Sequence, residues 1–218
     1  MSDPDATASL VVYADFVCPF CYLGKASLEA YLDDAEDPPA IDWRPFDLRS
    51  HKRGPDGTID HGIDDGKDDA YFDQVKENVE RLSQRYDVDM SLDHAREVDS
   101  WNAQLAMLGV EASTDAETAD AFREAVFDAL WLDSADIGDP DVLEGVARSV
   151  GIDEALVSDS VADDALEATL RDRFRAAQDA GITAVPTFVF GEHAARGAVP
   201  PAQLRRLIEG AGPSGEDL

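Results

Sequence analysis

A Cys-x-x-Cys pair between an apolar run and an amphipathic segment constrains the fold of this chain more than any other feature. The run 10–17 (LVVYADFV) is rich in β-branched and aromatic residues, as expected of a strand buried on both faces. Segment 21–32 (CYLGKASLEAYL) then carries Leu and Tyr residues at the three-and-four spacing of a helix. The motif CPFC, residues 18–21, therefore lies where a buried strand runs directly into a helix.

This position favours redox chemistry over the other uses of such a motif. A zinc ion or an iron–sulfur cluster usually takes four ligands, and the chain has 2 cysteines. A disulfide between Cys18 and Cys21 closes too short a loop to stabilise the fold by much. The plain alternative is that both cysteines are small buried core residues.

The position on the helix gives the two thiols different roles. Cys18 lies at or near the N-cap, and Pro19 suits the first helical position because its missing N–H costs nothing there. The free backbone N–H groups and the positive end of the helix dipole stabilise a thiolate at Cys18. We therefore expect Cys18 to be the exposed attacking thiolate, and Cys21, which faces the protein, to resolve the mixed disulfide.

A second element of the predicted site lies in segment 181–190 (GITAVPTFVF). A proline directly before a strand is expected where the Val185-Pro186 bond is cis, because a cis bond leaves backbone free to hydrogen-bond an extended substrate. The alternative is an ordinary proline at the start of a strand. With Pro19 and Phe20 between the cysteines, Val185 and Pro186 make up the predicted substrate-binding residues.

The order of predicted elements indicates an α/β, thioredoxin-like fold, with a central mixed β-sheet flanked by helices and a large all-helical insertion. Segment 41–48 predicts a second strand, interrupted or at a sheet edge near Pro45, and Trp43, Phe46 and Phe188 are expected in the core. Two further strands (187–190 and 194–197) and a helix (200–209) follow near the end. We divide the chain into a first thioredoxin-like part (1–69), the helical insertion (70–165) and a second thioredoxin-like part (166–218).

Start and stop signals punctuate the helical part of the sequence. Asp139 before Pro140 predicts an N-cap followed by a proline at the first helical position. Gly109, Gly151 and Gly181 follow helical runs, as glycines that end helices do. The segments with helical periodicity are 71–86, 100–108, 114–132, 140–150 and 163–179, and their succession predicts a helical layer or bundle.

The charge balance indicates the environment of the protein. The chain has 47 acidic and 18 basic residues, a net charge of −29, and among the basic residues only 4 are Lys. The acids are spread along the whole sequence, so we expect a hydrated surface suited to molar salt, where the Debye length is about 3 Å, as in a halophile. Binding of a basic partner is the alternative. The same charge opposes a nucleic-acid partner.

We expect a cytoplasmic protein, either a monomer or a homodimer, without a membrane partner. No apolar run approaches the roughly 20 residues of a membrane-spanning helix, and residues 1–9 lack the features of a signal peptide. Segment 49–69, rich in Gly and Asp, predicts a long exposed loop. Its His51 and His61 fit no metal-ligand spacing, so we expect no metal there.

The CPFC motif after a buried strand, the Val-Pro-Thr strand near the end and the helices between them resemble the DsbA-like family of thioredoxin-fold proteins. The similarity is greatest to cytoplasmic dithiol-disulfide isomerases, including members associated with polyketide biosynthesis. It covers nearly the whole chain and is most specific in 127–153 and 181–209. The resemblance implies redox roles for Cys18 and Cys21 and a cis-proline loop at Val185 and Pro186. It also implies protein or small-molecule thiols and disulfides as substrates, an unidentified electron donor or acceptor, and no cofactor beyond the redox-active disulfide.

Two positions depart from the family pattern. The subgroup often has a histidine where Met107 stands, so any role of that histidine is absent here. The periplasmic oxidant of the family has Pro-His between its cysteines, whereas this chain has Pro19-Phe20. Because Phe20 cannot donate a hydrogen bond to the thiolate, we expect a less stabilised thiolate and a less oxidising couple.

Asp15 either relays a proton for Cys21 or faces solvent at the strand end, and Tyr22 is expected at the rim of the site. Glutathione-dependent kappa-class transferases and hydroxychromene-carboxylate isomerases share the superfamily but need no resolving thiol, so Cys21 argues against that function. A redox-sensing or metal-binding module without catalysis is the remaining alternative.

Overall fold

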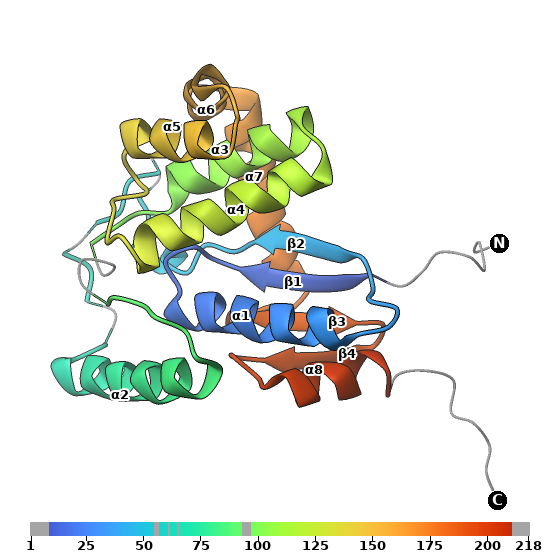
Figure 1. Cartoon of the computed structure of the whole chain (residues 1–218). Coiled ribbons are helices and arrows are strands. Elements are labelled where there is room, and N and C mark those ends of the chain that lie inside the picture. The colour runs from blue at the N-terminus through green and yellow to red at the C-terminus, as the bar shows by residue number, and fades with distance from the viewer. Residues whose placement is uncertain (1–8, 55–56, 61, 65, 93–96, 211–218) are drawn as a thin grey trace, which may run out of the picture.

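A four-stranded mixed sheet forms the centre of the molecule (Figure 1). The computed structural model describes residues 9–54, 57–60, 62–64, 66–92 and 97–210, so His61 and residues 1–8 lie outside the described residues. The strands are β1 (Leu10–Ala14), β2 (Ile41–Pro45), β3 (Thr187–Phe190) and β4 (His193–Arg196), in the order β2-β1-β3-β4. β1 pairs parallel with β2 and antiparallel with β3, which confirms the predicted mixed sheet.

Helices flank this sheet, as predicted. They are α1 (Pro19–Asp34), α2 (Asp69–Tyr86), α3 (Trp101–Ser113), α4 (Ala116–Trp131), α5 (Pro140–Ser149), α6 (Glu154–Val161), α7 (Asp164–Asp179) and α8 (Pro201–Ile208). Figure 1 shows α3 to α7 gathered together, whereas α2 lies apart from them and packs against α1. The helices between β2 and β3 thus occupy two places in the fold and do not form one bundle. No helix in the described part is long and apolar enough to cross a bilayer.

β1 is buried on both faces, which confirms the interpretation of its apolar sequence. Leu10 and Val12 pack with the buried residues of α1 and α8 on one face. Val11 and Tyr13 pack on the other face with residues of α3 and α4. Pro45 ends β2 at the edge of the sheet, where the absence of its N–H removes no ladder hydrogen bond from the centre.

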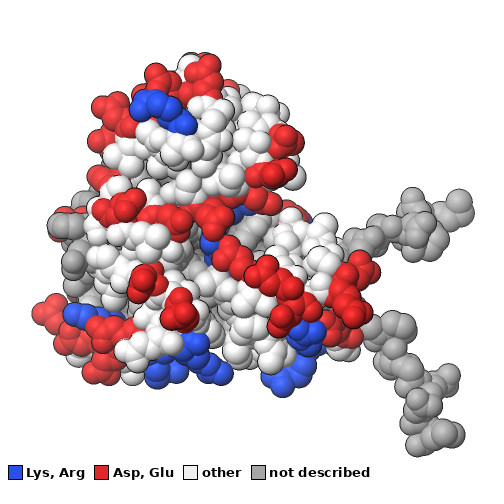
Figure 2. All heavy atoms as spheres, viewed as in Figure 1, with Lys and Arg blue, Asp and Glu red and all other residues white. Residues whose placement is uncertain are grey.

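Aspartates begin many of the helices. An Asp side chain accepts a hydrogen bond from a backbone N–H at the start of α2, α4, α5, α6 and α7; these N-caps are Asp68, Asp115, Asp139, Asp153 and Asp163. Such a cap contributes about 1 kcal/mol to helix stability. The predicted cap at Asp139 is therefore one member of a larger set. Part of the acidic excess thus has a structural role, and Figure 2 shows acidic side chains spread over the whole visible face.

The prediction that Gly109 ends a helix is wrong, because α3 continues past it to Ser113. A Cβ at Gly109 would lie 1.8 Å from the Oγ of Ser160, so the glycine permits α3 and α6 to pack closely. Gly151 and Gly181 follow α5 and α7 with φ of 79° and 74°, as predicted. α6 was not predicted, since its eight residues are too few to establish helical periodicity.

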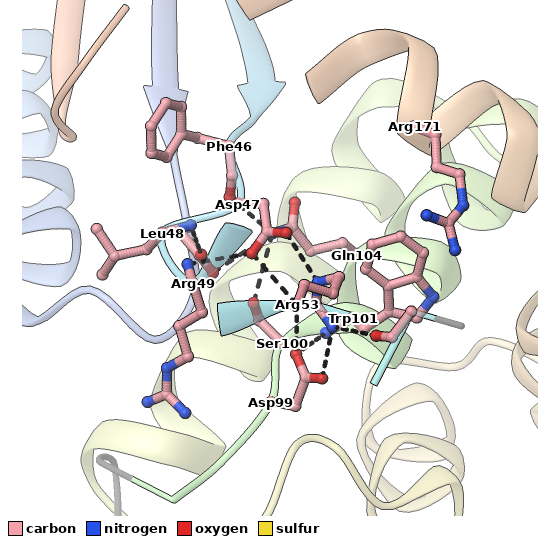
Figure 3. Close-up of polar contacts among 12 residues, drawn as sticks. Phe46, Asp47, Leu48, Arg49, Arg53, Asp99, Ser100, Trp101, Gln104 and Arg171 are labelled. Carbon is pink, nitrogen blue, oxygen red and sulfur yellow. Dashed lines mark hydrogen bonds and ion pairs between the residues drawn. The ribbon is translucent and has the colours of Figure 1, made fainter. Parts of the chain in front are cut away.

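The segment after β2 is not simply an exposed loop, contrary to the prediction. Arg53 donates hydrogen bonds to Asp47 Oδ2 and Asp99 Oδ2, each at 2.8 Å, and its side chain is 6% exposed (Figure 3). Its guanidinium lies 4.5 Å from the centroid of the Trp101 ring, and that of Arg171 lies 4.8 Å from the same centroid. We call the group formed by Asp47, Arg53, Asp99, Trp101 and Arg171 the Arg53 cluster. It joins the segment after β2 to the start of α3.

Candidate active site

Cys18 lies at the junction of β1 and α1. It is the N-cap of α1, with an extended backbone (φ −95°, ψ 112°), and Pro19 is the first helical residue, as expected from the sequence. The Cys18 N–H donates to Asp15 O at 3.1 Å, and Cys18 O accepts from Cys21 N at 2.9 Å. The short turn after β1 thus places the first thiol at the helix N-terminus and the second one in the first turn.

The chain brings Val185 to this thiol from 167 positions away. Cys18 Sγ donates to Val185 O at 3.5 Å, and the Val185-Pro186 peptide bond is cis. Gly24 of α1 allows this approach because it has no side chain; a Cβ at this position would lie 2.9 Å from Pro186 Cγ. The cis bond expected from the sequence is therefore present beside the dithiol.

Both cysteines are free thiols, and neither is broadly exposed. Cys18 is 3% exposed, so the expectation of an exposed thiol is wrong. Cys18 instead lines a cavity of about 650 Å³ together with Pro19, Phe20 and Val185. The Cys18 thiol therefore faces a concave surface. Cys18 also belongs to a cluster of buried apolar side chains. One of them, Trp131, lines the same cavity.

Cys21 is 1% exposed, behind Cys18. Burial raises the pKa of the Cys21 thiol well above its ordinary value, and a hydrogen bond with Cys18 raises it further. Negative charge on Cys18 acts in the same direction. These effects hold the Cys21 thiol in its protonated form at neutral pH.

Asp15 is 2% exposed and does not face solvent, so that alternative is wrong. Burial raises its pKa to about 6, although hydrogen bonds from Ser100 and the Leu48 amide oppose the increase. The Leu48 N–H donates to Asp15 Oδ2 at 2.8 Å. The backbone of Asp15 also hydrogen-bonds the Cys21 thiol, and its carboxylate charge raises the pKa of that thiol. Asp15 thus lies beside Cys21.

Gln104 of α3 is a site residue that sequence reasoning missed. Its Nε2 donates to Asp15 Oδ1 at 3.3 Å and to Phe46 O at 3.0 Å, so it ties the carboxylate to the end of β2. Figure 3 shows Gln104 reaching from α3 towards Phe46 and Leu48. The available signal was a glutamine between Ala103 and the apolar stretch LAMLGV (105–110), because a buried amide needs hydrogen-bond partners.

Tyr22 and Met107 lie in the core. Tyr22 is 7% exposed, and its hydroxyl donates to Asp128 Oδ1 at 2.9 Å, so the expectation that it lines the rim is wrong. The Tyr22 ring stacks on that of Trp131, with centroids 6.4 Å apart and an angle of 24° between the ring planes. Met107 is 6% exposed and packs in the same apolar cluster. Within the described residues, no group of three or more His, Cys, Asp or Glu side chains is placed to hold a metal ion.

A buried strand that enters a helix at a Cys-x-x-Cys pair, opposite a cis-proline loop, is the arrangement of a thioredoxin-fold protein. The particular family follows from the sequence as a whole. The chain belongs to the DSBA-like thioredoxin domain family, whose model matches residues 9–209.

Individual relatives agree with this membership. The chain is 28% identical to the uncharacterized protein YwbO of Bacillus subtilis over 93% of this chain and 96% of that protein. It is 21% identical to the probable DsbA oxidoreductase SCO1869 of Streptomyces coelicolor, with a TM-score of 0.77 over 97% and 92% of the two chains. A 2-hydroxychromene-2-carboxylate isomerase is 20% identical, with a TM-score of 0.72 over 87% and 89%. The two structures share the fold with this chain.

Proposed function

We propose that the protein is a thiol-disulfide oxidoreductase or isomerase that acts on protein or small-molecule disulfides. The main support is the placement of Cys18 at the N-cap of α1, with its sulfur 3.5 Å from Val185 O inside a cavity. Backbone N–H groups at a helix N-terminus stabilise a thiolate, and a concave site next to free backbone suits an extended substrate.

The proposed reaction has two exchange steps. The Cys18 thiolate attacks one sulfur of a substrate disulfide, forms a mixed disulfide and releases the other sulfur as a thiolate. Cys21 then loses its proton and attacks the Cys18 sulfur, which releases the second substrate thiolate. The Cys18–Cys21 pair is thereby oxidised by two electrons and the substrate disulfide is reduced to two thiols. The same steps in reverse oxidise a substrate.

Asp15 is proposed as the proton relay of the second step. The thiol of Cys21 has a raised pKa and is buried, so it needs a base within the protein. With a pKa of about 6, the Asp15 carboxyl is mostly ionised at neutral pH and lies beside Cys21. A base with a pKa near the working pH transfers protons efficiently in both directions.

The proposal includes the setting of the reaction. Phe20 offers the Cys18 thiolate no hydrogen bond, so we propose a weakly oxidising couple. The Cys18–Cys21 disulfide is the proposed redox group, without a further cofactor, and the protein is proposed to work in the cytoplasm of a salt-adapted cell. The electron partner would be a thiol or disulfide, and the protein would act as a monomer or a homodimer without nucleic acid or membrane.

A trapping experiment tests the proposal. Reduced Cys21→Ser protein should accumulate a mixed disulfide through Cys18 when it is incubated with bis(2-hydroxyethyl) disulfide, because the resolving thiol is gone. Cys18→Ser should accumulate none, since Cys21 is buried. Mass spectrometry detects the adduct. If Cys21→Ser formed no adduct and Cys18 showed no accelerated alkylation, the dithiol would not be a redox centre. Full turnover of Cys21→Ser on an isomerase substrate would favour the single-nucleophile function instead.

A further inference from the structure

Two segments from different parts of the chain hold the carboxyl group of Asp15. The backbone N–H of Leu48, after β2, donates to Asp15 Oδ2 at 2.8 Å. The side chain of Ser100, the N-cap of α3, is buried and hydrogen-bonds the same carboxyl group. Gln104, one helical turn later, donates to Asp15 Oδ1 at 3.3 Å. These uncharged donors favour the ionised form of the carboxyl group, because only that form accepts from all of them.

The Arg53 cluster fixes both segments. Nε and Nη2 of Arg53 donate to the two carboxylate oxygens of Asp47, at 2.8 and 3.2 Å. Its Nη1 and Nη2 donate to those of Asp99, at 2.8 and 2.9 Å (Figure 3). Asp47 directly precedes Leu48 in the chain, and Asp99 directly precedes Ser100. Each carboxylate that Arg53 binds is therefore one residue away from a group that holds the proposed proton relay.

A guanidinium group suits this double contact. It is planar, permanently charged and holds its N–H groups in a fixed fork, so it sets the distance between two carboxylates. The Arg53 side chain is 6% exposed, and its guanidinium carbon lies over the Trp101 ring, 4.5 Å from the centroid. Gly57 O accepts a further hydrogen bond from Arg53 Nη1 at 2.7 Å. The two segments therefore cannot separate without breaking the hydrogen bonds of Arg53 to one of its aspartates.

Arg53 also affects the charge beside Asp15. Burial raises the pKa of Asp15 to about 6, the hydrogen bonds from the two segments lower it, and the charge of Asp47 raises it. The ion pair with Arg53 offsets that charge of Asp47. Two other ionisable groups interact with the Asp15 charge: the buried Cys21 thiol of α1, and the Arg49 guanidinium, whose pKa is lowered by burial. Loss of Arg53 would therefore strengthen the effect of Asp47 on the relay.

We propose that Arg53 is a positioning residue, which keeps the Asp15 carboxylate ready to accept the proton of Cys21. It acts by holding the two donor segments together and by offsetting the charge of Asp47. The inference rests on the exchange and the relay proposed above, and it assigns them a residue that does not line the Cys18 cavity. In the step concerned, the Cys21 proton passes to Asp15, the Cys21 sulfur bonds to the Cys18 sulfur, and the bond from Cys18 to the substrate sulfur breaks, which releases the substrate thiolate.

The pH profile of this second exchange step tests the inference. Reduced protein is mixed with excess 2,2′-dipyridyl disulfide, and each exchange step releases one pyridine-2-thione, so stopped-flow absorbance gives the two rates separately. In the parent, the second rate should rise with pH around the pKa of Asp15, which is about 6. Asp15→Asn should remove this transition. Circular dichroism at each pH value verifies that every variant is folded.

Variants of the ion pair should move the midpoint of this transition. Arg53→Met should raise it by about one pH unit, which is the effect of losing one hydrogen bond to a charged group. Arg53→Lys should raise it less, because the ammonium group keeps the charge but lacks the fork. Asp47→Asn should lower it, because the variant removes the negative charge that raises the pKa of Asp15, after burial the main cause.

Arg123→Met is the matched control. The Arg123 side chain is 9% exposed and pairs with two carboxylates, those of Glu111 and Asp120, so the variant removes a comparable ion-pair network. Neither partner is next to a residue that hydrogen-bonds Asp15. Arg123→Met should therefore lower the stability of the protein without moving the midpoint.

Each outcome decides between the inference and the function on which it rests. An unchanged midpoint in Arg53→Met, or an equal shift in Arg123→Met, would overturn the inference while the exchange stood. If Arg53→Met did not fold, unchanged midpoints in Arg53→Lys and Asp47→Asn would overturn it. A transition that persisted in Asp15→Asn would refute the relay and the inference together. Release of only one thione by the parent would refute the proposed two-step exchange itself.

Discussion

The titration of Asp15 makes the stability of the folded protein depend on pH. Its pKa of about 6 in the folded protein lies above the ordinary value of 3.8, because the carboxyl is buried. Folding is therefore favoured by the protonated form, and the stabilisation is lost as the pH rises through the folded pKa. A difference of roughly 2 pK units corresponds to about 3 kcal/mol in total, of which about 1.4 kcal/mol falls between about pH 5 and about pH 8.

Asp15→Asn removes this titration. The free energy of unfolding of the variant, minus that of the parent, should therefore increase by about 1.4 kcal/mol from about pH 5 to about pH 8. The hydrogen bonds that Asn makes or loses with Leu48 and Gln104 change the free energy of unfolding equally at the two pH values. The change between these pH values therefore reports the titration of the carboxyl alone. Asp172→Asn is the control, because its side chain is 71% exposed and the net charge changes by the same amount.

Urea unfolding followed by tryptophan fluorescence measures this difference at the two pH values. A pH-independent difference for Asp15→Asn would refute a raised pKa and with it the role of burial. The variant also tests the relay, since it should slow the release of the second thiol from a mixed disulfide at neutral pH. Stopped-flow measurement of that step distinguishes the relay from a stability effect, because it is made on folded protein.

Three further predictions concern packing and ion pairs; urea unfolding measures the stability change in the first and the third, and the rate of mixed-disulfide formation is measured in the second. Gly109→Ala should destabilise the protein by about 1–3 kcal/mol through overpacking against Ser160, and adding Ser160→Gly should restore part of the loss. Gly24→Ala should displace Pro186 and lower the rate at which Cys18 forms a mixed disulfide; an unchanged rate would contradict this. Arg53→Met should cost about 3–5 kcal/mol because it leaves two buried or half-buried carboxylates unpaired, whereas a loss below about 1 kcal/mol would contradict a structural role.

The sheet and the dithiol were predictable because each depends on a local pattern. The apolar run before Cys18 specifies a buried strand, and the change to helical spacing after Cys21 specifies a helix. The Val185-Pro186 element was predictable from a proline placed directly before an apolar strand. Each of these signals is contained within a short segment.

What the sequence did not reveal depends on contacts between distant segments. Gln104 bonds to Asp15 across 89 positions, and Gly109 is explained by Ser160 of another helix. The burial of Cys18 likewise follows from the helices that cover the dithiol and not from the helix that carries it. Arg53 lies in a segment of loop composition, but its partners, the buried Asp47 and the partly exposed Asp99, come together only in the folded chain.

The position of β3 in the sequence determines when the site is completed during synthesis. β1 is synthesised early, whereas β3, its antiparallel partner at the centre of the sheet, is synthesised far later. Val12 of β1 lies opposite Phe188 of β3. Closing so long a segment of chain is entropically costly and slow. A growing chain therefore carries both thiols well before the Val185 carbonyl arrives to meet Cys18. Completion of the cavity at Cys18 is thus tied to the last part of translation, and a chain that ends before β3 holds both cysteines without that cavity.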